Sequence, residues 1–242
     1  MEASERIVSA RNEALFPPTL ARLGGLLYLL VILGGIFGEI VARGSLIVPG
    51  DAAATASHLR ASEGLWRAGI AVDLVCCACT IGLAWILYGL LRTVDRKLAL
   101  LMIFVDVIAI GLQAAFDLNL VAALLPLGSA AYLKVFTPRQ LETLAYLSVR
   151  THAFGYGISL LFFGLVFPIR GWLIVRSGFL PRVIGVLVSI AGLGYLVNGF
   201  TLILAPALAG KLFMFVALPI LAGEGSLCLW LLFKGVNVEK YA

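Results

Sequence analysis

Long apolar runs dominate the chain, and short polar stretches separate them. A helix needs about 20 apolar residues to cross the hydrocarbon core of a bilayer, and six runs reach that length. The predicted spans lie near Leu20–Ala42, Ala68–Leu91, Leu98–Leu124, Thr151–Val175, Val183–Leu204 and Leu212–Phe233. The pattern therefore predicts an all-α, polytopic membrane protein with a single bundle of about six transmembrane helices.

Two connections between the predicted spans are longer than the others and lie near residues 43–66 and 125–150. In the first, Asp51 follows a Pro-Gly turn and precedes Ala-rich sequence, which is typical of the N-cap of a short surface helix. In the second, Thr137, Pro138 and Gln140 form a capping-box signature. We expect a helix to begin there and to continue into the fourth span.

Composition excludes an ordinary soluble protein, because 62% of the residues are hydrophobic and 13% are charged, with a mean hydropathy of +1.06. The net charge of +5 indicates no nucleic-acid partner, since the basic residues sit in short groups between apolar runs. Seven of the 18 Lys and Arg residues lie on the predicted side of the membrane opposite to the two chain ends: Arg43, Arg60, Arg67, Lys134, Arg139, Arg150 and Lys211.

The other eleven Lys and Arg residues are predicted to lie on the same side of the membrane as the two chain ends. By the positive-inside rule this bias favours an N-in, C-in orientation. We therefore predict a cytoplasmic segment at residues 1–19, a six-helix domain at 20–235 and a cytoplasmic tail at 236–242.

Five carboxylates interrupt the apolar runs: Glu39, Asp73, Asp106, Asp117 and Glu224. An ionisable group at the bilayer centre costs about 2.5–3.5 kcal/mol on insertion scales, so such groups usually face protein or water. At 100° per residue, Asp106, Gln113 and Asp117 fall on one stripe, and His152 shares a face with Tyr156. We expect these polar faces to meet in the interior of the bundle.

With the N-terminus inside, most of these polar residues fall in the outer half of the membrane, which predicts an acidic pocket open to the outside. The basic residues expected near it are His152 in the interior and Arg67 and Arg150 at the rim. A proton, a metal ion or an organic cation is therefore the expected ligand of this pocket. The candidate ligand-binding residues are Glu39, Asp73, Gln113, Asp117, His152, Tyr156, Asn198 and Glu224.

Two other functions stay open at the level of sequence. His58 and His152, with Asp73 or Asp117, are candidates for a metal-assisted hydrolase that acts on a lipid or an amphiphile. The polar residues can also serve only to fix helix packing in a structural or accessory subunit. No nucleotide-binding or nucleophile motif occurs, so no cofactor and no catalytic residue is assigned. The lipid bilayer and a small cationic or amphiphilic ligand are the expected partners, with the oligomeric state open.

Several segments together resemble a family of small bacterial membrane proteins known as a domain of unknown function, DUF4386. They are SLIVPGDAAATA, RAGIAVDL, ISLLFFGL, RSGFLPRVIGVL, AGLGYLVNGF and GEGSLCLWLLFKGV. The resemblance implies a six-helix protein of the bacterial inner (plasma) membrane. It supplies no activity and no catalytic residue, so the predicted pocket rests on the residues of this chain.

Overall fold

The computed structural model of the 242-residue chain describes residues 18–236, apart from the side chains of residues 18, 210, 213 and 214. The predicted terminal segments, 1–19 and 236–242, fall outside this range except for residues 18, 19 and 236. The described residues form helices and turns and contain no strand. The helices are α2 (Pro18–Ile36), η1 (Phe37–Arg43), α3 (Gly44–Leu46), α4 (Ala52–Ala61), α5 (Glu63–Leu91), α6 (Arg96–Ala122), η2 (Leu125–Leu127), η3 (Ala131–Val135), α7 (Pro138–Ser177), α8 (Arg182–Leu204), α9 (Pro206–Leu229) and η4 (Trp230–Lys234).

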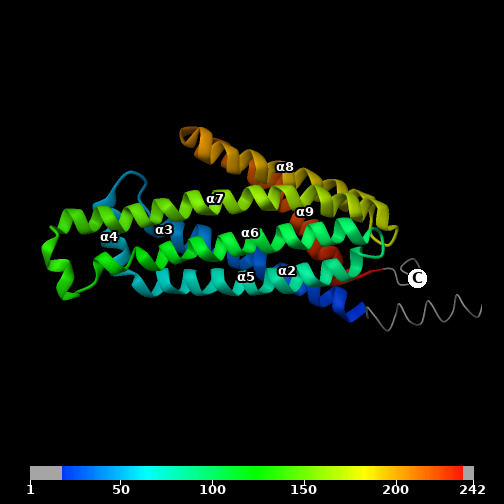
Figure 1. Cartoon of the computed structure of the whole chain (residues 1–242), viewed down its shortest axis with the longest axis horizontal. Helices are drawn as coiled ribbons and strands as arrows, with labels where there is room; N and C mark the ends of the chain where they lie inside the picture. The colour runs from blue at the N-terminus through cyan, green and yellow to red at the C-terminus, as the bar shows by residue number, and fades with distance from the viewer. Residues whose placement is uncertain (1–17, 237–242) are drawn as a thin grey trace, which may run out of the picture.

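Six of these segments are long and apolar enough to cross a membrane, which confirms the predicted fold class. The first span is a composite in which the π-helix η1 joins α2 to α3, and the last combines α9 with the π-helix η4. An even number of spans brings both chain ends to the same side. Figure 1 shows the start of α2 and the end of η4 at one end of the bundle, here called the terminal end.

The opposite end, here called the loop end, carries α4, η2 and η3 (Figure 1). Both caps predicted there are confirmed. The Asp51 carboxylate accepts a hydrogen bond from the Ala54 amide at 2.9 Å and caps α4. Thr137 and Gln140 form the capping box of α7, which runs without a break for 40 residues and includes the fourth span.

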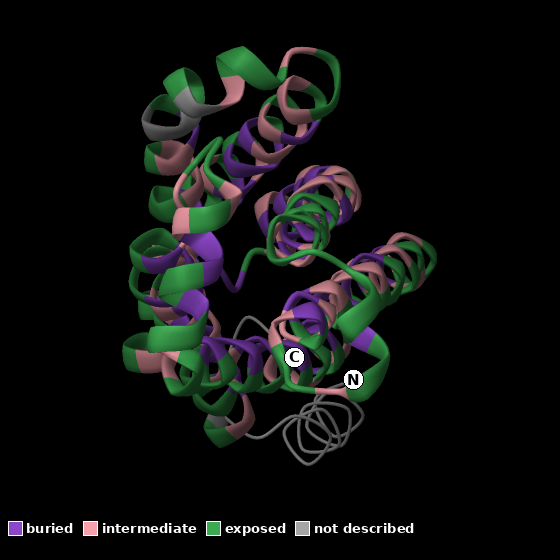
Figure 2. Ribbon diagram, turned by 90° about the vertical axis from the view of Figure 1, so that its left-hand side faces the viewer, coloured by how far each residue is buried: buried purple, intermediate pink, exposed green. Residues whose placement is uncertain are grey.

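The spans form a ring in chain order. Each span packs against the ones before and after it, and α2 packs also against α9 and η4, which closes the series. Buried positions face the inside of this arrangement, and exposed positions face outward (Figure 2). Exposed apolar side chains follow α8 at alternating steps of three and four residues: Val183, Val186, Ile190, Leu193, Val197 and Phe200. This spacing marks the face of α8 that lipid covers.

Glycines bring α7 and α8 close together as an antiparallel hairpin. Each helix carries three glycines seven residues apart, and they oppose each other in the pairs Gly171–Gly185, Gly164–Gly192 and Gly157–Gly199. A Cβ on Gly185 would lie 2.5 Å from the Gly171 carbonyl oxygen, and one on Gly199 would lie 2.9 Å from the Gly157 carbonyl oxygen. Small residues of this kind let membrane helices approach at backbone distance.

Candidate functional site

A bidentate ion pair joins the first two spans inside the bundle, near the loop end. Arg43 Nη1 lies 2.5 Å from Asp73 Oδ2, and Arg43 Nη2 lies 3.2 Å from Asp73 Oδ1. The same Nη2 donates to Glu39 Oε1 at 3.1 Å. Arg43 and Asp73 are buried, with 7% and 4% exposure, whereas the Glu39 side chain is 40% exposed. One guanidinium is therefore shared by two carboxylates.

The π-helix η1 carries both Glu39 and Arg43, and its Gly38 makes room for the pair. A Cβ on Gly38 would lie 2.6 Å from Asp73 Oδ1 and 2.8 Å from Arg43 Nη2. Wider π-helical turns occur mostly as short interruptions of α-helices and are frequent at functional sites. Here the interruption lies at the residues that hold the interior ion pair.

A second buried ion pair joins α6 to α7, closer to the terminal end. Arg170 Nη2 donates to both carboxylate oxygens of Asp106, at 3.0 and 2.9 Å. Asp106 is fully buried, and the Arg170 guanidinium also lies over the Phe167 ring at 4.8 Å from its centroid. Because Arg170 is 4% exposed, its charge depends on Asp106 for compensation.

The same two helices share a third polar contact nearer the loop end. His152 Nε2 lies 3.1 Å from Asp117 Oδ1, and both residues are buried. The Tyr156 ring stacks on the His152 ring with 6.0 Å between centroids. Asp117 Oδ2 is buried and has no hydrogen-bond partner among the described residues. One oxygen of this carboxylate is thus available to a further donor.

Glu224 on α9 has a neutral partner. Its Oε1 accepts a short hydrogen bond from the hydroxyl of Tyr195 on α8, and Glu224 itself is half-buried. Arg170 lies within electrostatic range of Glu224 but makes its hydrogen bonds to Asp106. Among the described residues, Glu224 therefore has no basic side chain in an ion pair with it.

The polar residues form two groups at different depths. The loop-end group contains Glu39, Arg43, Asp73, Asp117 and His152, in which Asp73 lies within electrostatic range of Asp117. The central group contains Tyr28, Asp106, Arg170, Tyr195 and Glu224, in which Tyr28 lies within range of Glu224, Arg170 and Asp106. Tyr156 lies within range of both Asp73 and Glu224 and so stands between the two groups.

The structure thus brings part of the predicted site together. Glu39 and Asp73 share Arg43, and Asp117, His152 and Tyr156 form one cluster. Gln113 and Asn198 are half-buried, and their side chains make no hydrogen bond to another described residue. Glu224 belongs to the central group rather than to the loop-end group.

The predicted charge balance of the interior is corrected. His152 was expected to be the only basic residue there, with Arg43 and Arg170 as anchors at the membrane surface, but both arginines are buried and paired with carboxylates. Two signals in the sequence point to this outcome. Arg43 follows Glu39 by four residues, and Arg170 interrupts the apolar stretch VFPIRGW.

Residues 23–235 match the family described as a domain of unknown function, DUF4386. The chain belongs to the DUF4386 family. The match covers all six spans, from within the first to the end of the last. No curated protein and no solved structure matches the chain. The residues of this DUF4386 protein are therefore the basis on which its function is inferred.

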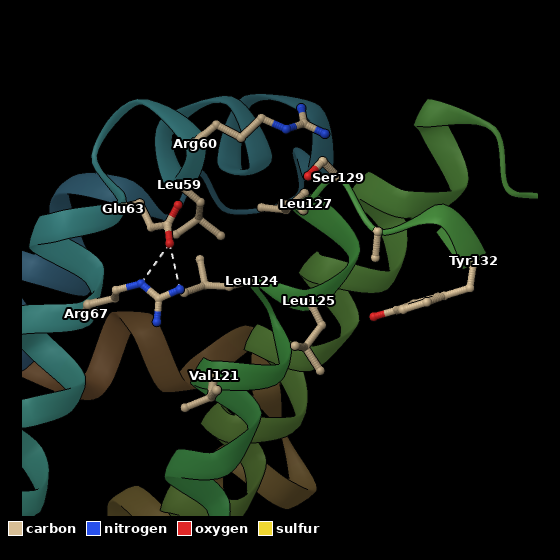
Figure 3. A pocket seen from close by; sticks show the side chains of 12 residues that line it. Leu59, Arg60, Glu63, Arg67, Val121, Leu124, Leu125, Leu127, Ser129 and Tyr132 are labelled. Atoms are coloured by element: carbon tan, nitrogen blue, oxygen red, sulfur yellow. Dashed lines mark hydrogen bonds and ion pairs between the residues drawn. The ribbon is translucent and has the colours of Figure 1, made fainter. Parts of the chain in front are cut away.

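This DUF4386 protein also has a cavity of about 390 Å³ at the loop end, shown in Figure 3. Its walls come from α4, the start of α5, the end of α6 and the connection that follows α6. None of the eight predicted site residues lines it. The acidic interior and this cavity are thus two separate features.

The ligands that a metal-assisted hydrolase needs are not brought together. Within residues 18–236, no group of three or more His, Cys, Asp and Glu side chains is arranged to hold a metal ion. His58 contacts the Leu46 carbonyl oxygen, with 3.3 Å between Nδ1 and the oxygen. His152 instead contacts a single carboxylate, that of Asp117.

Proposed function

We propose that this DUF4386 protein binds a small cationic or protonatable molecule in its polar interior and carries it across the membrane. The observation that supports this is an excess of interior carboxylates. Among the described residues, the basic side chains paired with any of Glu39, Asp73, Asp106, Asp117 and Glu224 are those of Arg43, Arg170 and His152. A carboxylate in a low-dielectric interior needs a cation or a proton, and Glu224 has no basic partner of its own.

The depth of the polar groups supports passage as well as binding. Glu39 has a 40% exposed side chain near the loop end, and Glu224 lies in the central group. Tyr156 lies within electrostatic range of both carboxylates, so polar groups follow one another from the loop end toward the centre. In the predicted N-in orientation the loop end faces outward, which makes Glu39 the first carboxylate that an external cation meets.

Binding is tested by thermal unfolding of the purified protein in mild detergent with sodium, potassium, choline, ethidium and spermidine as probes. A ligand that binds the folded state stabilises it by RT ln(1 + [L]/Kd), about 2.7 kcal/mol at 100 times Kd. We expect at least one probe to raise the unfolding temperature of the wild type. Glu224→Gln should abolish that rise, and the matched control Glu63→Gln, at an exposed position, should keep it.

Transport is tested with the same variants in proteoliposomes that contain a pH-sensitive dye. If the cation exchanges for a proton at Glu224, adding the stabilising cation outside should release protons from the vesicle interior in the wild type and not in Glu224→Gln. A wild type that none of the probes stabilises, and that moves no protons, would contradict the proposal.

A packing role is the second candidate, and the pairing of each interior aspartate with a basic side chain favours it. Under this alternative, Glu224→Gln changes the unfolding temperature by the same amount with and without every probe. The two candidates therefore differ in the response to ligand rather than in stability itself.

A further inference from the structure

The cavity at the loop end has both apolar and polar walls. Its volume of about 390 Å³ lies within the range of about 300–1,000 Å³ that is typical of small-molecule sites. Leu59, Leu124 and Leu127 supply apolar wall, and Figure 3 shows Leu59 and Leu124 between the charged residues of α4 and α5 and the end of α6. Polar side chains lie around this apolar part, which gives the cavity two chemically different regions.

The wall carries two solvent-exposed guanidinium groups, those of Arg60 and Arg67. Arg67 donates Nε and Nη2 to Glu63 Oε1, both at 2.7 Å, so its Nη1 has no partner among the described residues. Arg60 extends above the cavity and forms an ion pair with Glu142, in which Nη1 and Oε1 are 3.7 Å apart, beyond hydrogen-bond distance. Two arginines and one glutamate thus line the cavity, and a second carboxylate, Glu142, stands beside Arg60 outside the wall.

The cavity lies where the second and third spans reach the membrane surface, since Glu63 begins the second span and Leu127 ends the third. An exposed apolar stripe on the third span leads to it. Leu118, Val121 and Leu125 are 67%, 37% and 59% exposed, and the last two line the cavity. Their spacing of three and four residues places them on one face, so the cavity is continuous with the surface that the acyl chains of the bilayer cover.

We infer that this cavity binds an anionic phospholipid of the surrounding membrane. The phosphate lies between Arg60 and Arg67, the glycerol and first chain carbons contact Leu124 and Leu127, and one acyl chain descends along Val121 and Leu118. A basic pocket at the level of the headgroups is a recurrent way to hold an anionic lipid. Arg60 and Arg67 are exposed and keep N–H groups that no carboxylate accepts from among the described residues, so a phosphate can bind them, whereas the ammonium group of a zwitterionic headgroup is repelled by the same arginines.

Native mass spectrometry of the delipidated protein in detergent tests the site. Phosphatidylglycerol and phosphatidylcholine with identical acyl chains are the probes. The wild type should bind one phosphatidylglycerol on the order of tenfold more tightly than phosphatidylcholine. Inorganic phosphate, added as a competitor at millimolar concentration, should not displace the lipid, because it lacks the chain that covers the apolar wall.

Variants separate the cavity from general surface charge. Arg60→Gln with Arg67→Gln should remove the preference for phosphatidylglycerol. Arg139→Gln with Arg150→Gln, the same change of charge at exposed positions of the loop end outside the cavity, should keep it. Ser129→Trp, which fills the cavity and leaves both arginines in place, should weaken the binding of phosphatidylglycerol by a similar factor.

Three results would overturn the inference. They are equal affinity of the wild type for the two lipids, a retained preference in the Arg60 and Arg67 double variant, and a retained affinity in a folded Ser129→Trp protein. Displacement of the lipid by inorganic phosphate would instead assign the site to a soluble phosphate compound. Glu63→Gln adds a gain of function, since removal of the one carboxylate of the wall should tighten the binding of phosphatidylglycerol.

Discussion

Single residues in this protein act through the partner they face inside the membrane. Asp106 and Arg170 lie on different helices, are almost fully buried and bind each other through two hydrogen bonds. Removal of one member of such a pair leaves an uncompensated charge in a low dielectric, whereas removal of both leaves none. The pair therefore behaves as a unit rather than as two independent polar residues.

A double-mutant cycle measures this dependence. Asp106→Leu and Arg170→Met, made singly, should each destabilise the protein by about 3–5 kcal/mol, as for buried pairs that lose one partner. The double variant should be more stable than either single variant. Thermal or denaturant unfolding in detergent provides the measurement.

The exposed pair of Glu63 and Arg67 serves as the control for this cycle. Its coupling energy should be about 0–1 kcal/mol, because solvent screens it. If the Asp106 and Arg170 effects were simply additive, the two residues would not depend on each other in the way the hydrogen bonds indicate.

Gly38 and Gly35 offer a second comparison at the residue scale. An Ala at position 38 places its Cβ against Asp73 and Arg43, whereas a Cβ at position 35 meets no atom within 4 Å. Gly38→Ala should therefore displace the ion pair and destabilise the protein by about 1–3 kcal/mol, and Gly35→Ala should have little effect. Equal unfolding temperatures for the two variants would show that the pair tolerates the extra methyl group.

Sequence reasoning found the interior carboxylates because each interrupts an apolar run. It did not find the partners of Asp73 and Asp106, because Arg43 and Arg170 lie near the ends of predicted spans, where basic residues usually anchor a helix at the membrane surface. Tyr195 was not predicted, for a different reason. A tyrosine in an apolar run carries no charge, and its role depends on what the neighbouring helix presents, which helical phase alone does not reveal.

Among the elements, the hairpin of α7 and α8 has close backbone packing at three successive levels. Its register is symmetric, because the three glycine pairs are equidistant in sequence from Gly178, which ends α7 in a left-handed conformation with φ +72°. The seven-residue spacing keeps the glycines on one face of each helix. The interface of this hairpin therefore has no room for larger side chains at the glycine positions.

Substitution of Gly192 tests this tight packing. A Cβ there would lie 2.6 Å from Pro168 Cδ and 2.8 Å from Phe167 Cβ, so Gly192→Leu should separate the two helices and destabilise the protein by about 1–3 kcal/mol or more. Gly111→Leu is the control, since Gly111 lies on an exposed face of α6 with no atom near its Cβ position. Unfolding temperature in detergent distinguishes them, and a loss in the Gly111 variant as large as that in the Gly192 variant would argue against the packing explanation.

At this scale the sequence predicted more than at the residue scale. Apolar length located the six spans, and the capping residues Asp51 and Thr137 marked two helix starts. The glycine register was not predicted, because the spacing of glycines along one helix does not show which residues the neighbouring helix presents. The π-helical segments η1 and η4 were missed as well, since no local residue pattern distinguishes a wider turn from an ordinary one inside an apolar helix.

The spans form a ring, with the start of α2 and the end of η4 at one end of the bundle. The balance of Lys and Arg residues predicts that this terminal end is cytoplasmic. A fluorescent protein that matures only in the cytoplasm should therefore fluoresce when fused after Ala242. The same protein inserted after Ser129, in the connection at the loop end, should not fluoresce. The reverse pattern would invert the predicted orientation and would make the acidic interior open toward the cytoplasm.

The buried ion pairs have a consequence for the order in which the spans enter the membrane during synthesis. Asp106 precedes Arg170 by 64 residues, and Arg43 precedes Asp73 by 30, so in each case one charge leaves the ribosome before its counterpart exists. Insertion of a span with an unpaired charge at the bilayer centre costs about 2.5–3.5 kcal/mol. We therefore expect the third span to stay beside the insertion machinery until the fourth span has been synthesised. A chain truncated after Ala122 should be degraded by quality-control proteases rather than form a stable half-bundle.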